Sequence, residues 1–204
     1  MNFDQMKFNR DTFGSPENHG VVISPQEAYE LLREWVTNEK LIAHMQQVGH
    51  LMRRYAASRE YDVADQHRWY LAGLLHDADW EKWPNTHCNK IVEELEKRKL
   101  DPEIIRAIAS HGPKYFGVEP VSEMDKMLYA FDELSGLIHA YSLMRPEGYL
   151  GMEVKGVRKR LKDKTFAAQV SREDIADAAL RAEIELDELI KFVLIHQIDA
   201  NSVE

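Results

Sequence analysis

The chain has 204 residues, which is enough for one domain with a substantial core and short for two large domains. Its 44% apolar and 30% charged residues are typical of globular proteins and unlike those of disordered chains. Lys and Arg number 26 against 35 Asp and Glu, and the formal net charge of −9 argues against nucleic acid or an anionic membrane as a partner. A small anionic substrate would therefore need a local positive site.

The single cysteine, Cys88, cannot form an internal disulfide bond, which fits a reducing cytoplasm. Residues 1–22 mix charged and aromatic side chains and lack the apolar core of a signal peptide, so we expect a flexible N-terminal arm. No later stretch has the roughly 20 apolar residues needed to cross a bilayer. These features predict a cytoplasmic protein with no membrane partner.

Helix-start signals recur along the chain. Ser24 is followed by a first-turn proline and by Glu27, which can complete a capping box. Similar signals begin at Asp101, Ser122 and Ser171. Between these signals, apolar residues recur at spacings of three and four, the period of an amphipathic helix. No segment has a convincing strand pattern, so the sequence predicts an all-α fold.

The predicted helices lie near residues 24–37, 39–58, 62–78, 86–99, 102–110, 122–144, 153–162, 171–182 and 186–199. Residues 113–120 and 145–151 contain Gly and Pro and are expected to be loops. We therefore expect a single helical domain over residues 23–200. Its core would span about 39–146, and its C-terminal helices would span 153–199.

A candidate metal site begins where the apolar run at residues 73–75 leads directly into His76 and Asp77. An imidazole beside a carboxylate offers the nitrogen and oxygen ligands that suit borderline divalent metals. A His-Asp pair taken alone would fit a polar helix end or a local hydrogen-bonded pair equally well. Its meaning depends on the residues around it.

Two further residues extend this pair into a longer order. His44 lies in an earlier predicted helix, and Asp132 lies in an apolar helical stretch, where an unpaired carboxylate would be costly. The order His44, His76-Asp77, Asp132 resembles that of the HD-domain superfamily, over roughly residues 39–146. The resemblance implies an HD-type helical bundle, a metal-dependent phosphohydrolase activity and four metal ligands in these residues.

His87 and His111 lie between the His-Asp pair and Asp132, an order that resembles the two-metal branch of the superfamily. The resemblance implies that Asp77 bridges two metals and that His87 and His111 bind the second one. If that metal is absent, the two histidines could contact substrate or act as general acid and base. His111 followed by Gly112 also fits an ordinary helix end, because glycine ends helices and an imidazole is favourable there.

Basic side chains indicate where a phosphate group could bind. Lys82 follows the His-Asp pair, as a lysine does in many members of the superfamily, although the spacing is looser here. Arg145, Lys155 and Lys159 lie in or before the most basic run of this acidic chain and could contact phosphate. A solvated amphipathic helix explains that run as well. His139, two helical turns beyond Asp132, could line the pocket or be a core histidine.

The predicted reaction is hydrolysis of a phosphoester, in a nucleotide or another small phosphorylated metabolite. One or two divalent metals would lower the pKa of bound water to roughly 7 and stabilise charge on the phosphoryl oxygens. Iron or manganese is favoured, and nickel, cobalt and zinc also suit the ligands. The candidate catalytic residues are Asp77, Lys82, His87 and His111.

Two other functions stay open. Some HD proteins use the same ligand order as a mixed-valence di-iron oxygenase, which activates dioxygen instead of water. A non-catalytic helical module that binds a ligand or partner would keep the metal residues as remnants or structural ligands. Amphipathic helices can bury their apolar faces within one chain or between two, so the protein could be a monomer or a homodimer.

Overall fold

The computed structural model describes residues 20–197, apart from the side chains of residues 115 and 116. Within this part of the chain the backbone forms helices and no strand, with one isolated parallel bridge between Val21 and Leu100. The prediction of an all-α fold is confirmed. The helices are α1 Pro25–Trp35, α2 Glu39–Ser58, α3 Val63–Leu75, the 3-10 turn Pro84–Thr86, α4 Asn89–Lys97, α5 Pro102–Ser110, α6 Pro113–Phe116, α7 Glu123–Ser142, α8 Val154–Lys162, α9 Arg172–Ala182 and α10 Leu186–His196.

Local capping explains where several of these helices begin. The Ser24 hydroxyl accepts from the Glu27 N–H while the Glu27 carboxylate accepts from the Ser24 N–H, and this capping box satisfies donors that the first turn leaves unpaired. Ser122 and Asp125 form the same reciprocal pair at the start of α7. The predicted N-caps are confirmed at Ser24, Asp101, Ser122 and Ser171.

Three predicted boundaries were wrong. Helix α3 ends at Leu75 and not at residue 78, because the chain then follows tight turns in which Ala78 donates to the Leu75 carbonyl at 3.2 Å. Helix α4 begins at Asn89 and not at residue 86, after the separate 3-10 turn. The predicted loop at 113–120 contains the short helix α6, which starts at a proline and ends at the left-handed Gly117. The last residues of the predicted helix 186–199 lie outside the described range.

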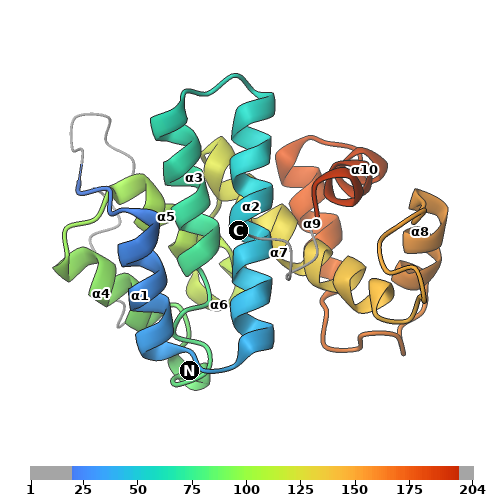
Figure 1. Ribbon diagram of the computed structural model, residues 1–204, viewed down its shortest axis with the longest axis horizontal. Helices are drawn as coiled ribbons and strands as arrows, with labels where there is room; N and C mark the ends of the chain where they lie inside the picture. Colours follow the sequence, from blue (N-terminus) through green and yellow to red (C-terminus); the bar gives the residue numbers. More distant parts are fainter. Residues whose placement is uncertain (1–19, 198–204) are drawn as a thin grey trace.

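The antiparallel pair α2 and α3 lies at the centre of the fold (Figure 1). Helices α1, α4 and α5 lie on one side of this pair, and α8, α9 and α10 lie on the other. Helix α7 packs against both α2 and α5 and extends toward α8. Because α2 and α3 run in opposite directions, the first turns of α2 and the end of α3 lie at the same end of the pair.

Two glycines allow α2 and α3 to pack closely. A Cβ atom added to Gly73 would lie 2.6 Å from the Cα atom of Gly49, and one added to Gly49 would lie 3.0 Å from the carbonyl oxygen of Tyr70. Backbone atoms cannot move aside as a flexible side chain can. This close approach brings His44, five residues before Gly49, toward His76, which follows Gly73 by three residues.

Replacing Gly73 with alanine should lower the free energy of unfolding by about 1–3 kcal/mol, because the added methyl group overpacks the α2–α3 contact. Gly136 in α7 is the matched control, since nothing lies within 4 Å of a Cβ atom added there. Gly136→Ala should raise stability by up to about 1 kcal/mol, the helix-propensity gain. Denaturant unfolding measures both changes, and a neutral Gly73→Ala variant would contradict the close packing.

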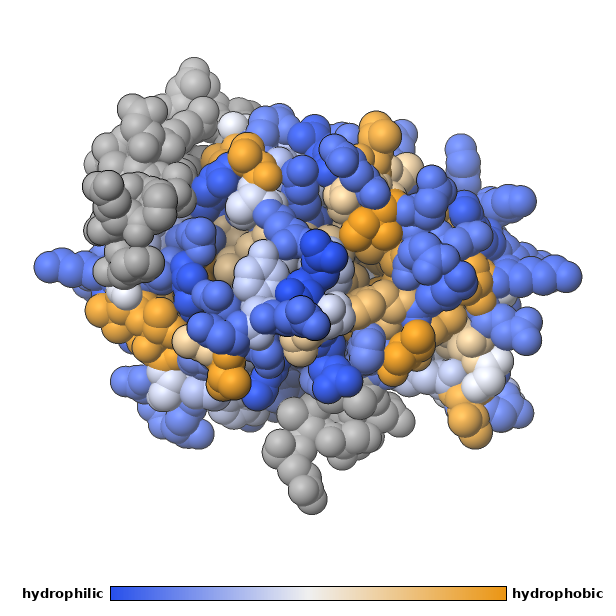
Figure 2. Space-filling view, turned by 90° about the horizontal axis from the view of Figure 1, so that it is seen from above, coloured by the Kyte–Doolittle hydropathy of each residue, from blue (hydrophilic) through white to orange (hydrophobic). Residues whose placement is uncertain are grey.

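Figure 2 shows a face on which hydrophilic side chains predominate and apolar side chains form separate patches. Among residues 20–197, no helix is both long and apolar enough to span a bilayer.

Candidate metal centre

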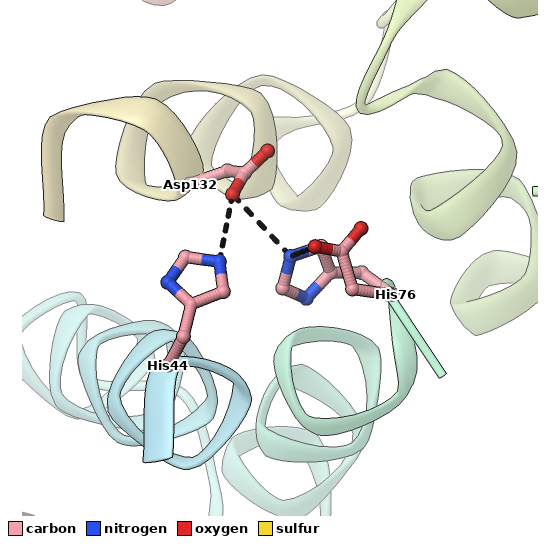
Figure 3. A group of neighbouring side chains, drawn as sticks. His44, His76 and Asp132 are labelled. Atoms are coloured by element: carbon pink, nitrogen blue, oxygen red, sulfur yellow. Dashed lines mark hydrogen bonds and ion pairs between the residues drawn. The ribbon is translucent and has the colours of Figure 1, made fainter. Parts of the chain in front are cut away.

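Three helices bring the first group of candidate ligands together (Figure 3). His44 comes from the second turn of α2, His76 follows the end of α3, and Asp132 comes from the middle of α7. The Asp132 Oδ1 atom lies 3.0 Å from His44 Nε2 and 3.4 Å from His76 Nε2. With Asp77, these residues offer ligand atoms that all lie within 4.8 Å of one another.

The orientation of His76 is set by the backbone of its own helix. Its Nδ1 atom lies 2.8 Å from the Gly73 carbonyl oxygen, which can only accept, so Nδ1 carries the proton. The Nε2 atom then points toward Asp77 and Asp132. It is buried and lies 3.6 Å from Asp77 Oδ2 and 3.4 Å from Asp132 Oδ1, without a well-formed hydrogen bond to either. An imidazole nitrogen directed between two carboxylates is suited to bind a metal ion.

A second group contains Asp77, His87 and His111, whose ligand atoms also lie within 4.8 Å of one another. The Asp77 Oδ1 atom lies 3.2 Å from His87 Nε2 and 3.6 Å from His111 Nε2. His111 ends α5, and its Nδ1 atom donates to the Ile108 carbonyl at 2.5 Å, so its Nε2 atom is directed into the group. Asp77 therefore belongs to both groups.

Asp79 holds His87 in place. Its side chain is fully buried, and its Oδ1 atom accepts from His87 Nδ1 at 2.7 Å. The same carboxylate accepts from the backbone N–H groups of Cys88, Lys90 and Ile91 at 3.0–3.2 Å. These bonds anchor the N-terminus of α4, where the helix dipole favours a negative charge. A carboxylate that accepts a hydrogen bond from one ring nitrogen of a histidine fixes the tautomer and raises the basicity of the other ring nitrogen.

The two carboxylates of the cluster raise the pKa values of the neighbouring histidines. Burial alone would lower the pKa of His76, but the charges of Asp77 and Asp132 outweigh it and raise this pKa to about 9. Burial also opposes the charged form of His87, whereas hydrogen bonds to Asp77 and Asp79 raise its pKa to about 10. Without a metal, His76 and His87 therefore hold protons where a metal ion would otherwise supply the positive charge.

The pKa values of the two carboxylates, Asp77 and Asp132, are lowered. Burial would raise the pKa of Asp77, but charged His76 and hydrogen bonds from His111 and His87 hold it well below its ordinary value. The pKa of Asp132 is lowered in the same way, by the charge of His76 and by hydrogen bonds from His44 and His76 that outweigh its burial. Both carboxylates are thus ionised at neutral pH and available as ligands.

Two of the six side chains in the cluster are buried and the other four are partly exposed. The side chains of His76 and His111 are 0% and 4% exposed. The other four side chains are 10–23% exposed, and they are His44, Asp77, His87 and Asp132. Solvent therefore reaches four of the six side chains, while His76 and His111 are held in the interior.

Metal binding should release protons near neutral pH. A histidine must be deprotonated to bind a metal, and His76 and His87 have pKa values raised to about 9 and about 10 in the metal-free protein. The apparent metal affinity should therefore rise as the pH rises toward these values and fall as the pH drops. Calorimetric titration in buffers of different ionisation enthalpy counts the protons released. An affinity that does not change between about pH 6 and pH 9 would contradict this pKa assignment.

The predicted residue Lys82 and its neighbour Glu81 make contacts away from the two ligand groups. The Lys82 ammonium donates to the Glu34 carbonyl at the end of α1 at 2.9 Å and lies 5.8 Å from the centre of the Trp83 ring. Glu81 accepts from the backbone N–H groups of Thr37 and Asn38, just before α2. Both side chains therefore tie the turn after His76-Asp77 to α1 and α2.

The predicted phosphate contacts lie farther along the chain. Arg145 donates to the Leu150 carbonyl at 2.8 Å, in the turn after α7. Lys155 and Lys159 are exposed on α8, which lies across the molecule from α4 (Figure 1). His139 bonds the Tyr149 hydroxyl through Nδ1 at 2.6 Å. These residues are not members of the two ligand groups, and their contact with substrate stays a prediction.

The fold and the cluster together define an all-helical protein with a His/Asp site of the type that binds divalent metals. Comparison with protein families agrees, because the model of the HD domain family matches residues 41–137. Residues 41–137 are therefore similar to the HD domain family. HD domains are generally those of metal-dependent phosphohydrolases. No curated protein and no solved structure matches the chain.

Proposed function

We propose that the protein is a metal-dependent hydrolase of phosphoesters, acting on a nucleotide or another small phosphorylated metabolite. The observation that supports this most directly is the buried Nε2 atom of His76, which lies 3.6 Å from Asp77 and 3.4 Å from Asp132, both ionised. In the metal-free protein a proton on His76 balances these charges, and a bound cation would take the place of that proton. The family of the matched segment supplies the reaction class.

The ligand sets follow from the two groups. His44, His76, Asp77 and Asp132 would hold one ion, and Asp77, His87 and His111 would hold a second, with Asp77 shared. Four imidazoles and two carboxylates suit iron or manganese, with nickel, cobalt or zinc as further possibilities. Bound divalent metals lower the pKa of water and stabilise negative charge on phosphoryl oxygens.

The residues of the chain prepare the site for an anionic substrate. Asp77 and Asp132 bring two negative charges, so two divalent ions would leave the centre positive despite the net charge of the chain. Asp79 keeps His87 Nε2 directed at Asp77 by holding the proton on Nδ1. If only one ion binds, His87 is placed beside Asp77 to move a proton during hydrolysis.

The experiment that tests the proposal is metal analysis of purified protein followed by assays on a panel of phosphoesters. We expect one or two transition-metal ions per chain and metal-dependent release of phosphate. Dioxygen consumption by iron-loaded protein, without phosphate release, would overturn the hydrolase proposal in favour of the di-iron oxygenase. Protein that stays inert in both assays after metal loading would instead support a non-catalytic binding module.

A further inference from the structure

Trp80 differs from the other tryptophans of the chain. Its side chain is 47% exposed, whereas Trp69 is 3% exposed. Trp35 and Trp83 are half-buried and pack edge to face, with their ring centres 4.9 Å apart. Indole rings bury much apolar surface when they contribute to a core. The exposure of Trp80 therefore needs an explanation other than packing.

The backbone and the ring of Trp80 are both tied to the candidate metal centre. Its N–H donates to the Asp77 carbonyl at 3.0 Å, so the turn that presents Asp77 also positions Trp80. Its ring lies nearly perpendicular to the His87 ring, with the centres 4.9 Å apart and an interplanar angle of 86°. His87 is itself held by Asp79. The exposed indole surface is thus fixed beside a ligand group at its solvent side.

A fixed, exposed aromatic ring beside a phosphate site is suited to stack on a planar ring of the substrate. Such stacking needs no hydrogen-bond pattern, and it tolerates different bases because each has a π face. Removing one stacking aromatic weakens binding by about ten- to a hundredfold.

We propose that Trp80 is a specificity-determining residue that selects phosphoesters carrying a planar aromatic ring, such as a nucleobase, over those of saturated alcohols and sugars. This inference rests on the proposed phosphoester hydrolysis for the place of the phosphate. It goes beyond that function in naming the group next to the phosphate and the side chain that contacts it.

Two matched pairs of substrates test the selection. Adenosine monophosphate and ribose 5-phosphate differ only in the base, and phenyl phosphate and glycerol phosphate differ in whether a ring is attached directly. We expect Trp80→Leu to lower the ratio of kcat/KM for the aromatic member over its partner about tenfold, mainly through KM. Trp80→Phe, which keeps an aromatic face, should retain most of the ratio. If the ratio falls for the first pair, Trp80 contacts a nucleobase. If it falls for the second pair, Trp80 contacts a ring attached directly to the phosphate.

A binding measurement separates this inference from the proposed function. Adenosine has no phosphate, so it tests stacking even if no phosphoester is hydrolysed. We expect adenosine, and not ribose, to bind the wild-type protein in a calorimetric titration, Trp80→Phe to keep most of this affinity and Trp80→Leu to lose about tenfold. Equal substrate ratios in the wild type and Trp80→Leu, or equal adenosine affinities in these two proteins, would overturn the role of Trp80.

Discussion

Replacing Asp77 with alanine should remove metal from both ligand groups and lower phosphoester hydrolysis at least about a hundredfold. Asp77 is the residue common to the two groups, so its loss takes a ligand from each. It also leaves His76 and His87 with only one of their two neighbouring carboxylates, Asp132 and Asp79 respectively. Since bound metal contributes several kcal/mol to transition-state stabilisation, and each 1.4 kcal/mol is about a tenfold change in rate, the loss of rate is large.

Metal content and phosphate release of purified Asp77→Ala measure the two effects separately. His196→Ala is the control, because His196 lies on α10, accepts from Arg54 and packs on Phe192, outside both ligand groups. It should keep its metal and its activity. If Asp77→Ala binds as much metal as the wild type, the shared-ligand assignment is wrong, and if both variants lose activity equally, the loss reflects general destabilisation.

Removing His87 or His111 should lower the metal content of each chain from two ions toward one and reduce activity at least about tenfold. These histidines belong only to the second group, whereas His44, His76 and Asp132 belong only to the first. The first ion should therefore remain. Removing a residue that only hydrogen-bonds to a metal ligand commonly lowers metal affinity or activity ten- to a hundredfold. Removing a ligand itself should have an effect at least as large.

The stoichiometry of protein loaded anaerobically with excess iron or manganese checks this second prediction. The wild type should hold two ions roughly 3.5–4 Å apart, and His87→Ala and His111→Ala should each hold about one. A wild-type protein that binds only one ion would contradict the two-metal assignment. The histidines would then be candidates for substrate contact, the hydrolase proposal would stand, and the di-iron alternative would be excluded.

Much of the helical architecture can be predicted because its causes are local. Ser24 and Ser122 stand at helix starts since their hydroxyls can satisfy backbone donors within three residues. The amphipathic period then predicts which residues face the core. Boundaries were wrong where a neighbouring segment decides the outcome. Helix α3 ends early, for example, because the turn after Leu75 presents His76 and Asp77 to α2 and α7.

The candidate ligands could also be named from the sequence, through the order of His44, His76-Asp77 and Asp132 and its resemblance to a known family. That order does not reveal what surrounds them. Nothing in a single sequence shows that Asp79 binds His87 while anchoring α4, since the carboxylate and its partners meet only after the turn has formed. The exposure of Trp80 has no sequence signal either, and the sequence does not show that the Lys82 ammonium donates to the Glu34 carbonyl at the end of α1.

The sequence by itself determined the all-helical class, most helix starts and the set of residues able to bind metal, because capping, periodicity and side-chain chemistry are properties of short segments. The tertiary structure alone decided which ligand atoms share a site. His44 and Asp132 are 88 residues apart and meet at 3.0 Å. They meet because α7 packs across α2, and the close approach of α2 and α3 at Gly49 and Gly73 places His76 beside them. Long-range packing of this kind leaves no local pattern in the sequence.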